Sequence, residues 1–184
     1  MLLVSGSLRS GSTNAAVLRT AQTVAPADME CVLYDGLGVL PHFNPDDDAD
    51  PLPPAVAELR NLVHRADALV ICTPEYAGAL PGSLKNLLEW LIGDGDAHSI
   101  YRKPVAWINA SPRGATDAQD ALRKVLGYAH ATLLDEVSAE VPVSAPLIGA
   151  DGEIHDEPVR GQIRDMMARL RDALVAGRRK DDRW

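Results

Sequence analysis

The sequence predicts an α/β protein built on a doubly wound parallel sheet of five strands, with helices on both faces. Two observations support this fold class. Short apolar runs alternate along the chain with stretches of helical periodicity, and each run is continuously apolar, as is typical of strands covered on both faces. Connections of a dozen or more residues between successive strands return the chain to the same end of the sheet, which implies parallel pairing.

Five apolar runs are the expected strands, and five segments with helical periodicity follow them. The strands are expected at residues 2–4, 31–34, 68–72, 105–108 and, more weakly, around 137–143. The helices are expected at residues 13–24, around 56–63, 84–91, 117–129 and 158–176. The third helix is the clearest, because four leucines recur at helical spacing: Leu84, Leu87, Leu88 and Leu91.

The 184-residue chain is expected to form one domain, since its length and its 46% content of hydrophobic residues suffice for a single core. The fifth helix is expected to end at Gly177. The domain then spans residues 1–177, and the charged residues 178–184 form a disordered tail. Residues 35–54, rich in Pro and Asp, are expected to be a long surface loop.

The formal net charge of −8 disfavours a nucleic acid or an anionic membrane as partner. No apolar run approaches the roughly 20 residues of a membrane span, and the first residues lack the basic flank of a signal peptide. We therefore expect a cytoplasmic protein whose partners are small molecules and further copies of itself.

The two cysteines, Cys31 and Cys72, are expected to be buried free thiols. Each lies in an apolar run, far from a second Cys or a His at metal-ligand spacing, so no metal site is expected. The sequence has no Gly-x-Ser-x-Gly motif, and its five histidines have no evident nucleophile partner. We therefore expect no catalytic side chain.

Three loops have the composition of a binding site. Ligands of doubly wound sheets collect beyond the carboxyl ends of the strands, and here the loops after the first, third and fourth strands cover residues 5–13, 73–82 and 110–116. The first loop is small and polar, and Arg9 gives it a permanent charge. Its candidate donors to a phosphate monoester are Ser7, Ser12, Thr13 and Asn14.

Three other interpretations compete for the first loop. A nucleoside-triphosphate loop would need Lys after Gly11, where Ser12 stands, and a dinucleotide fingerprint would need Gly in place of Leu8. Neither motif fits. An ordinary Ser/Gly-rich turn that caps a helix remains open from the residues of the first loop alone.

Two motifs together carry a resemblance to a known family. Gly-Ser-Leu-Arg-x-x-Ser-x-Asn begins at Gly6, Pro-Glu-Tyr-x-Gly-x-x-Pro-Gly-x-Leu-Lys-Asn begins at Pro74, and Glu89-Trp90 follows. The chain, from the first strand to about the fourth helix, resembles the NADPH-dependent FMN reductases, a family that includes azo-dye, quinone and chromate reductases. The resemblance implies a flavodoxin-like fold and bound FMN.

The resemblance also implies roles for residues of all three loops. The residues that match the phosphate cradle are Ser7, Arg9, Ser12, Thr13 and Asn14. Those that match the segment along the isoalloxazine edge are Pro74, Glu75, Tyr76, Ala77 and Gly78. Ser111, Pro112, Arg113 and Gly114 would close over the carbonyl edge of the ring. Lys85 matches a family lysine, with a solvated surface side chain as the competing interpretation.

The chain departs from the family pattern at two places. Family members usually have Asn where Ala77 stands, and their third loop is commonly richer in glycine. The lost amide removes one polar tether, so flavin affinity or substrate geometry is expected to differ. Arg113 would lie near the pyrimidine end of the flavin or meet the 2′-phosphate of NADPH, and both placements remain open.

The activity implied by the resemblance is a ping-pong oxidoreduction. NADPH, or NADH, gives a hydride to N5 of FMN, and a small acceptor (flavin, quinone, azo compound or metal oxyanion) then takes it. A homodimer or homotetramer is expected, with the apolar third and fourth helices, near Trp90 and Trp107 in the sequence, as candidates for the interface. Two alternatives stay open: an FMN-binding electron carrier, and a flavin-free regulatory or interaction domain.

Overall fold

The expected parallel, doubly wound sheet is confirmed in the computed structural model, which describes residues 1–181. Its strands lie in the order β2-β1-β3-β4-β5, with the short β6 also paired to β4, and every pairing is parallel. The strands are β1 (Leu2–Ser5), β2 (Val32–Tyr34), β3 (Leu69–Cys72), β4 (Pro104–Asn109), β5 (Thr132–Leu133) and β6 (Ala139–Glu140). The order reverses between β1 and β3, so their carboxyl ends form the edge where ligands of such sheets bind.

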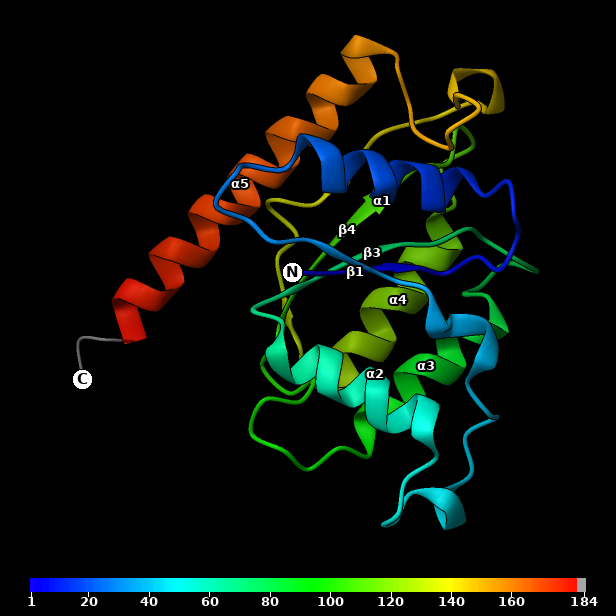
Figure 1. Ribbon diagram of the computed structural model, residues 1–184, viewed down its shortest axis with the longest axis vertical. Coiled ribbons are helices and arrows are strands. Elements are labelled where there is room, and N and C mark those ends of the chain that lie inside the picture. The colour runs from blue at the N-terminus through cyan, green and yellow to red at the C-terminus, as the bar shows by residue number, and fades with distance from the viewer. Residues whose placement is uncertain (182–184) are drawn as a thin grey trace.

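Helices cover both faces of the sheet (Figure 1). The helices are α1 (Thr13–Val24), α2 (Pro54–Arg65), α3 (Gly82–Ile92), α4 (Thr116–Tyr128) and α5 (Glu157–Asp181). In Figure 1, α1 and α5 lie on one face, and α2, α3 and α4 lie on the other. Three short 3₁₀ turns, Gly36–Val39, Pro45–Asp47 and Ala145–Leu147, interrupt the loops.

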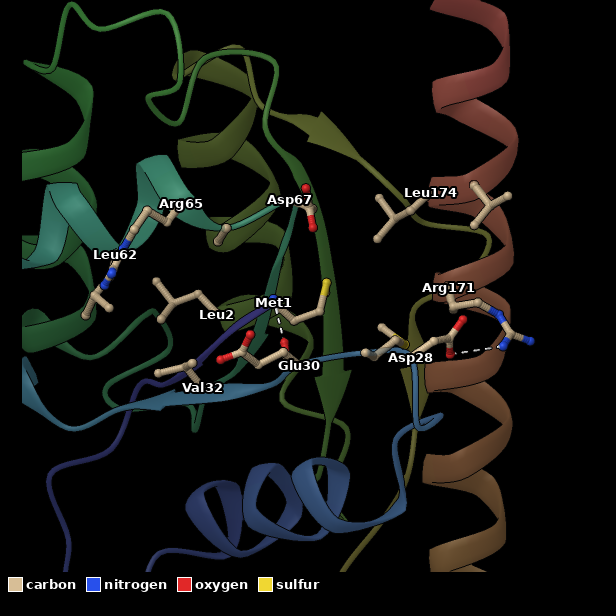
Figure 2. Close-up of a pocket in the computed structure, with 13 residues that line it drawn as sticks. Met1, Leu2, Asp28, Glu30, Val32, Leu62, Arg65, Asp67, Arg171 and Leu174 are labelled. Atoms are coloured by element: carbon tan, nitrogen blue, oxygen red, sulfur yellow. Dashed lines mark hydrogen bonds and ion pairs between the residues drawn. The ribbon is translucent and has the colours of Figure 1, made fainter.

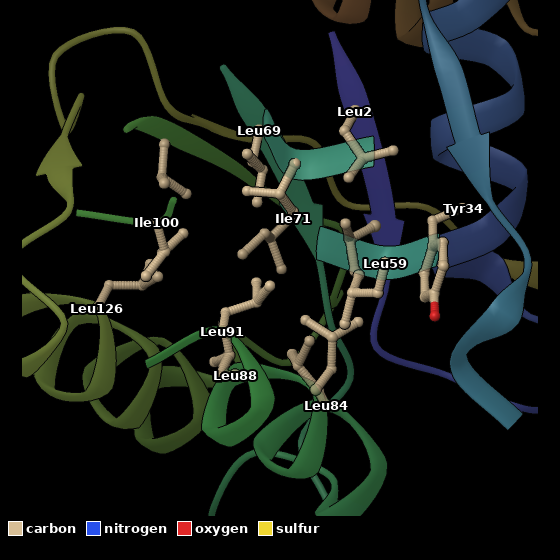
Figure 3. Close-up of a cluster of buried hydrophobic side chains, with 14 of the residues drawn as sticks. Leu2, Tyr34, Leu59, Leu69, Ile71, Leu84, Leu88, Leu91, Ile100 and Leu126 are labelled. Carbon is tan, nitrogen blue, oxygen red and sulfur yellow. The ribbon is translucent and has the colours of Figure 1, made fainter. Parts of the chain in front are cut away.

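The apolar side chains form two core clusters, one on each face. Along β3, Leu69 and Ile71 pack toward α2, α3 and α4, whereas Val70 and Cys72 pack toward α1 and α5. Figure 3 shows the first cluster, with strand residues such as Leu2 against leucines of α2 and α3. Because both faces are buried at the centre of the sheet, β1, β3 and β4 are almost continuously apolar, as the sequence indicates, whereas the shorter outer strands are more exposed.

The fifth strand differs from the expectation of one run around 137–143. Two separate two-residue strands pair with β4: Thr132 lies opposite Pro104, and Ala139 lies opposite Ile108. Between them the chain turns away, and the backbone N–H of Trp107 donates instead to Oγ of Ser138 at 3.1 Å. The Ser138 hydroxyl thus replaces the missing backbone acceptor. The periodicity of apolar residues in the sequence does not reveal this replacement.

The fifth helix also differs, since α5 continues through Gly177 to Asp181. A helix-ending glycine adopts a left-handed conformation, and Gly177 is not among the residues with positive φ. Residues 178–181 of the expected disordered tail are therefore helical, and residues 182–184 lie outside the described part. Figure 1 shows this end of α5 extending past the sheet.

The long loop at residues 35–54 is attached to α3. Nε1 of Trp90 donates to the Pro41 carbonyl at 2.9 Å, and the N–H of Phe43 donates to Oδ1 of Asn86 at 2.7 Å. Trp90 is 0% exposed and Trp107 is also buried. These two tryptophans therefore pack inside the chain and are not part of any subunit interface, while the interface expected from the third and fourth helices stays a prediction.

The expectation of two buried free thiols holds fully for only one of them. Both cysteines are free, but Cys31 is half-buried and Cys72 is completely buried. Cys31 precedes β2, at the edge of the sheet, where only part of its side chain is covered.

Candidate functional site

The three loops after β1, β3 and β4 line one cavity of about 440 Å³ at the carboxyl ends of the strands. All but three of the predicted site residues line it: Ser7, Arg9, Ser12, Thr13, Asn14, Pro74, Glu75, Tyr76, Ser111 and Arg113. Ala77, Gly78 and Gly114 do not line the cavity. Five further residues complete the lining: Thr73, Ala110, Pro112, Ala115 and Val143. The volume is within the usual range for small-molecule sites.

The first loop leads into the N-terminus of α1. Ser12 is the N-cap residue, and its Oγ accepts from the N–H of Ala15 at 3.3 Å. No acceptor within residues 1–181 is found for the N–H groups of Thr13 and Asn14, so these first-turn donors are available to a ligand. The exposed Arg9 forms no ion pair within residues 1–181. Free N–H groups at a helix N-terminus beside an unpaired guanidinium are well suited to bind an anion.

Asn14, in the first turn of α1, connects that helix to the end of β3. Its side chain is largely buried, with the residue only 9% exposed, yet it reaches the cavity lining. Its Oδ1 accepts from the thiol of Cys72 at 3.2 Å. Cys72 is a core residue, and burial raises the pKa of its thiol. The thiol is therefore a neutral donor and not a nucleophile.

The second loop contains a tight hairpin. Tyr76 and Ala79 exchange two backbone hydrogen bonds of 3.1 Å. The two residues between them, Ala77 and Gly78, have φ of 52° and 70°. Positive φ at both central positions defines a type I′ turn, which favours Asn-Gly. The Ala in place of Asn at position 77 therefore affects the preference of this turn for its conformation. It removes no group from the cavity, because the tip of the turn lies outside the lining.

Glu75 ties the second loop to α4. Ala115, the N-cap residue of α4, has φ of 49° and offers no side-chain acceptor. Oε2 of Glu75 accepts instead from the N–H of Ala118, in the first turn of the helix, at 3.2 Å. The carboxylate thus acts as a helix cap supplied by another loop, near the positive end of the helix dipole.

The third loop is held in shape by Asn109, which sequence analysis missed. Its Oδ1 accepts from the N–H of Ser111 at 3.1 Å, and its Nδ2 donates to the Gly114 carbonyl. Oγ of Ser111 accepts from the N–H of Arg113 at 3.2 Å. Asn109 and Thr73 are both buried polar residues at or just beyond the carboxyl end of an apolar strand. A polar residue at the carboxyl end of an apolar strand was the sequence signal that could have identified Asn109 and Thr73 as site residues.

The cavity concentrates positive charge in a chain of net charge −8. Arg113, like Arg9, is exposed and pairs with no carboxylate in the described part of the chain. The only carboxylate of the lining, that of Glu75, faces a helix N-terminus. The site therefore attracts anionic ligands.

Lys85 does not line the cavity. Its Nζ pairs with Oε1 of Glu89 at 2.6 Å, one turn along α3, and both side chains are substantially exposed. The solvated surface interpretation of this lysine is therefore the one that the structure supports.

A second cavity of about 520 Å³ lies near the amino ends of the strands (Figure 2). The amino group of Met1 donates there to the Glu30 carbonyl at 2.8 Å, and Arg171 of α5 pairs with Asp28 at 3.3 Å. Its charged groups are of both signs. It lacks the converging donors of the smaller cavity and lies away from the edge that binds ligands in this fold.

The doubly wound fold and the anion-binding loops at its switch point define a flavodoxin-like nucleotide-binding protein. Comparison with known proteins makes this specific. Residues 1–144 match the family described as NADPH-dependent FMN reductase, and the chain belongs to that family.

Two relatives and one solved structure are similar to this protein over nearly its whole chain. An NAD(P)H-dependent FMN reductase of Pseudomonas aeruginosa is 34% identical over 172 residues, or 92% of each chain. A 2-hydroxy-1,4-benzoquinone reductase of a Burkholderia species is 32% identical over 90% of each chain. A flavoenzyme NAD(P)H:(acceptor) oxidoreductase of Paracoccus denitrificans superposes with a TM-score of 0.76 at 29% identity, covering 91% of this chain and 94% of that one.

The family assignment confirms that the protein is a flavoenzyme oxidoreductase that uses FMN and NAD(P)H. It does not support the electron-carrier and flavin-free alternatives. The donors of the smaller cavity fit FMN, because free helix N–H groups, hydroxyls and Arg9 match a phosphate monoester. Within residues 1–181, no helix is both long and apolar enough to span a membrane.

Proposed function

We propose that this enzyme transfers a hydride from NADPH to a quinone-type small molecule by a ping-pong mechanism. The observation that carries the proposal is the single cavity at the switch point, whose lining combines the anion-binding donors of the first loop with the exposed Tyr76 and Arg113 of the other two loops at its mouth. Because the cavity has one mouth, NADPH and the acceptor would bind in turn at the same place, as in a ping-pong mechanism. Relatives named quinone reductases, such as that of Escherichia coli at 34% identity over 71% of each chain, support the acceptor class.

The part of the cavity that the first loop and the start of α1 line would hold the phosphate of FMN. The N–H groups at the start of α1 and the Arg9 guanidinium are the donors, with the Ser7 hydroxyl and the Asn14 amide beside them. Oγ of Ser12 already accepts a bond as helix cap, so this hydroxyl contributes its proton to the site.

The second and third loops would border the flavin ring. Tyr76, 51% exposed, forms a wall at the mouth. Glu75 holds this loop against α4, and Asn109 shapes the facing loop. When bound, FMN supplies the hydride chemistry for both half-reactions. No histidine lines the cavity and its one carboxylate caps a helix, so the chain's role is to bind and orient.

Arg113 would select the nicotinamide cofactor. It is exposed at the mouth, and its guanidinium suits the 2′-phosphate that distinguishes NADPH from NADH. We expect Arg113→Ala to raise the KM for NADPH and to leave that for NADH unchanged. Equal changes in both constants would favour the other placement, near the pyrimidine end of the flavin.

A homodimer or homotetramer would complete the mouth. Leu8 is 61% exposed between two residues of the lining, and Tyr76 is also exposed. Exposed apolar side chains beside an active-site mouth are suited to a subunit contact. Light scattering coupled to size-exclusion chromatography measures the oligomeric state directly, and a monomer would contradict this part of the proposal.

The test is anaerobic visible spectroscopy of the FMN-loaded protein, followed by steady-state kinetics. NADPH is expected to bleach the flavin absorption, and subsequent benzoquinone is expected to restore it. Parallel double-reciprocal lines for NADPH and quinone are expected for a ping-pong order. Intersecting lines would contradict that order, and a bleached flavin that quinone does not reoxidise would contradict the acceptor class.

A further inference from the structure

The end of β3 places a buried thiol against the first turn of α1. Cys72 is 0% exposed, and its S–H donates to Oδ1 of Asn14 at 3.2 Å, although the two residues are 58 positions apart. Cys72 lies opposite Ser5 in the pairing of β3 with β1. The thiol therefore lies beside the carboxyl end of β1 and in contact with the first turn of α1.

The thiol decides which end of the Asn14 amide meets a ligand. A side-chain amide has an oxygen that accepts and a nitrogen that donates, and the two exchange places when the group rotates by half a turn. No other hydrogen bond of the Asn14 side chain occurs within residues 1–181. With Oδ1 held by Cys72, the nitrogen is the end left for the cavity. A phosphate attracts this donor and would repel the oxygen.

Cys72 can hold this role because it remains a donor. Burial raises the pKa of the thiol, an effect that outweighs the opposing hydrogen bond of the Ala110 backbone. A protonated thiol is thus present over the whole neutral and mildly alkaline range. An aliphatic residue such as Val would fill the same core position without constraining the amide.

We propose that Cys72 is a positioning residue for the FMN phosphate, because its S–H fixes the Asn14 amide with the nitrogen toward the cavity. This inference rests on the placement of the phosphate at the start of α1 in the proposed function. Cys72 touches neither cofactor nor substrate and acts only through Asn14.

The test compares the affinity of the apoprotein for FMN and for riboflavin, which has the same ring without the phosphate. Flavin fluorescence quenching gives both dissociation constants. Cys72→Val is expected to weaken FMN binding about three- to tenfold, the effect of one hydrogen bond, and to leave riboflavin binding unchanged. Cys72→Ser keeps a donor and is expected to retain most of the FMN affinity. Cys31→Ser, at the other thiol, is the matched control.

A double-mutant cycle shows whether Cys72 acts through Asn14. Cys72→Val combined with Asn14→Ala is expected to bind FMN no more weakly than Asn14→Ala alone. Additive losses would overturn the proposal, as would equal weakening of FMN and riboflavin by Cys72→Val, which would indicate disturbed packing. If the unmutated protein binds FMN no better than riboflavin, the proposed phosphate site itself fails and the inference fails with it.

An infrared measurement tests the contact without altering Cys72. In a Cys31→Ser background, the S–H stretching band belongs to Cys72 alone. Asn14→Ala is expected to shift this band to the position of a free thiol, since it removes the acceptor. An unshifted band would overturn the proposal even if the Cys72 variants did not fold.

Discussion

Ala77 provides the sharpest test of how the second loop is built. Its φ of 52° places an L-residue with a Cβ in the left-handed region, which costs about 1–2 kcal/mol relative to the right-handed region. Glycine avoids this cost but gives up about 0.5–1 kcal/mol because the unfolded chain becomes more flexible. We therefore expect Ala77→Gly to stabilise the protein by about 0.5–1 kcal/mol.

Ala77→Asn is expected to stabilise by a similar amount, because Asn tolerates this conformation and suits the first central position of a type I′ turn. The side chain has room, since Ala77 is exposed. For a chain of this size, 1 kcal/mol shifts Tm by about 2–4 °C. The assay is calorimetric unfolding of the apoprotein, which keeps flavin binding out of the measurement.

Ala79→Gly is the matched control. Ala79 is in the same hairpin, but its φ is not positive, so glycine there is expected to lower Tm. If Ala77→Gly also lowers Tm, or if the two variants shift it equally, the left-handed turn is not the reason why this position differs. FMN affinity is expected to be unchanged in Ala77→Asn, because the hairpin tip lies outside the cavity lining.

Three further predictions concern the phosphate site, the loop contact and an alkaline transition. Arg9→Ala should weaken FMN binding by about 1.5–3 kcal/mol and spare riboflavin, as measured by equilibrium titration; unchanged FMN affinity would contradict the phosphate assignment. Glu75→Ala should destabilise the protein by about 1 kcal/mol in thermal unfolding, and Glu75→Gln, which keeps an acceptor oxygen, by less; equal losses would refute the capping role. Burial raises the pKa of Tyr34 from 10.0 to about 12, so the folded state holds this proton more tightly and stability is lost as pH rises through that range, by about 2–3 kcal/mol. Tyr34→Phe should remove that loss in denaturant unfolding at alkaline pH, and an unchanged pH dependence would show that Tyr34 is not responsible.

Local patterns in the sequence predicted most of the elements. The leucines of α3 and the continuous apolar runs of β1 and β3 depend only on which side chains must be buried, and periodicity reports this directly. The broken fifth strand was not predictable in this way, because the hydrogen bond of Ser138 to Trp107 joins residues 31 positions apart. The continuation of α5 through Gly177 depends on backbone conformation, which residue identity does not decide.

The sequence by itself determined the fold class and the three loops that line the site, because buried strands and small polar loops have local signatures. The roles within those loops were decided by tertiary structure. In the sequence, Glu75 is part of a motif expected along the flavin edge, yet its carboxylate caps α4 by accepting from the N–H of Ala118, 43 positions away. Cys72 reads as plain core, yet its thiol orients Asn14. A hydrogen bond depends on where two atoms meet in space, and only the folded chain brings such distant residues within reach.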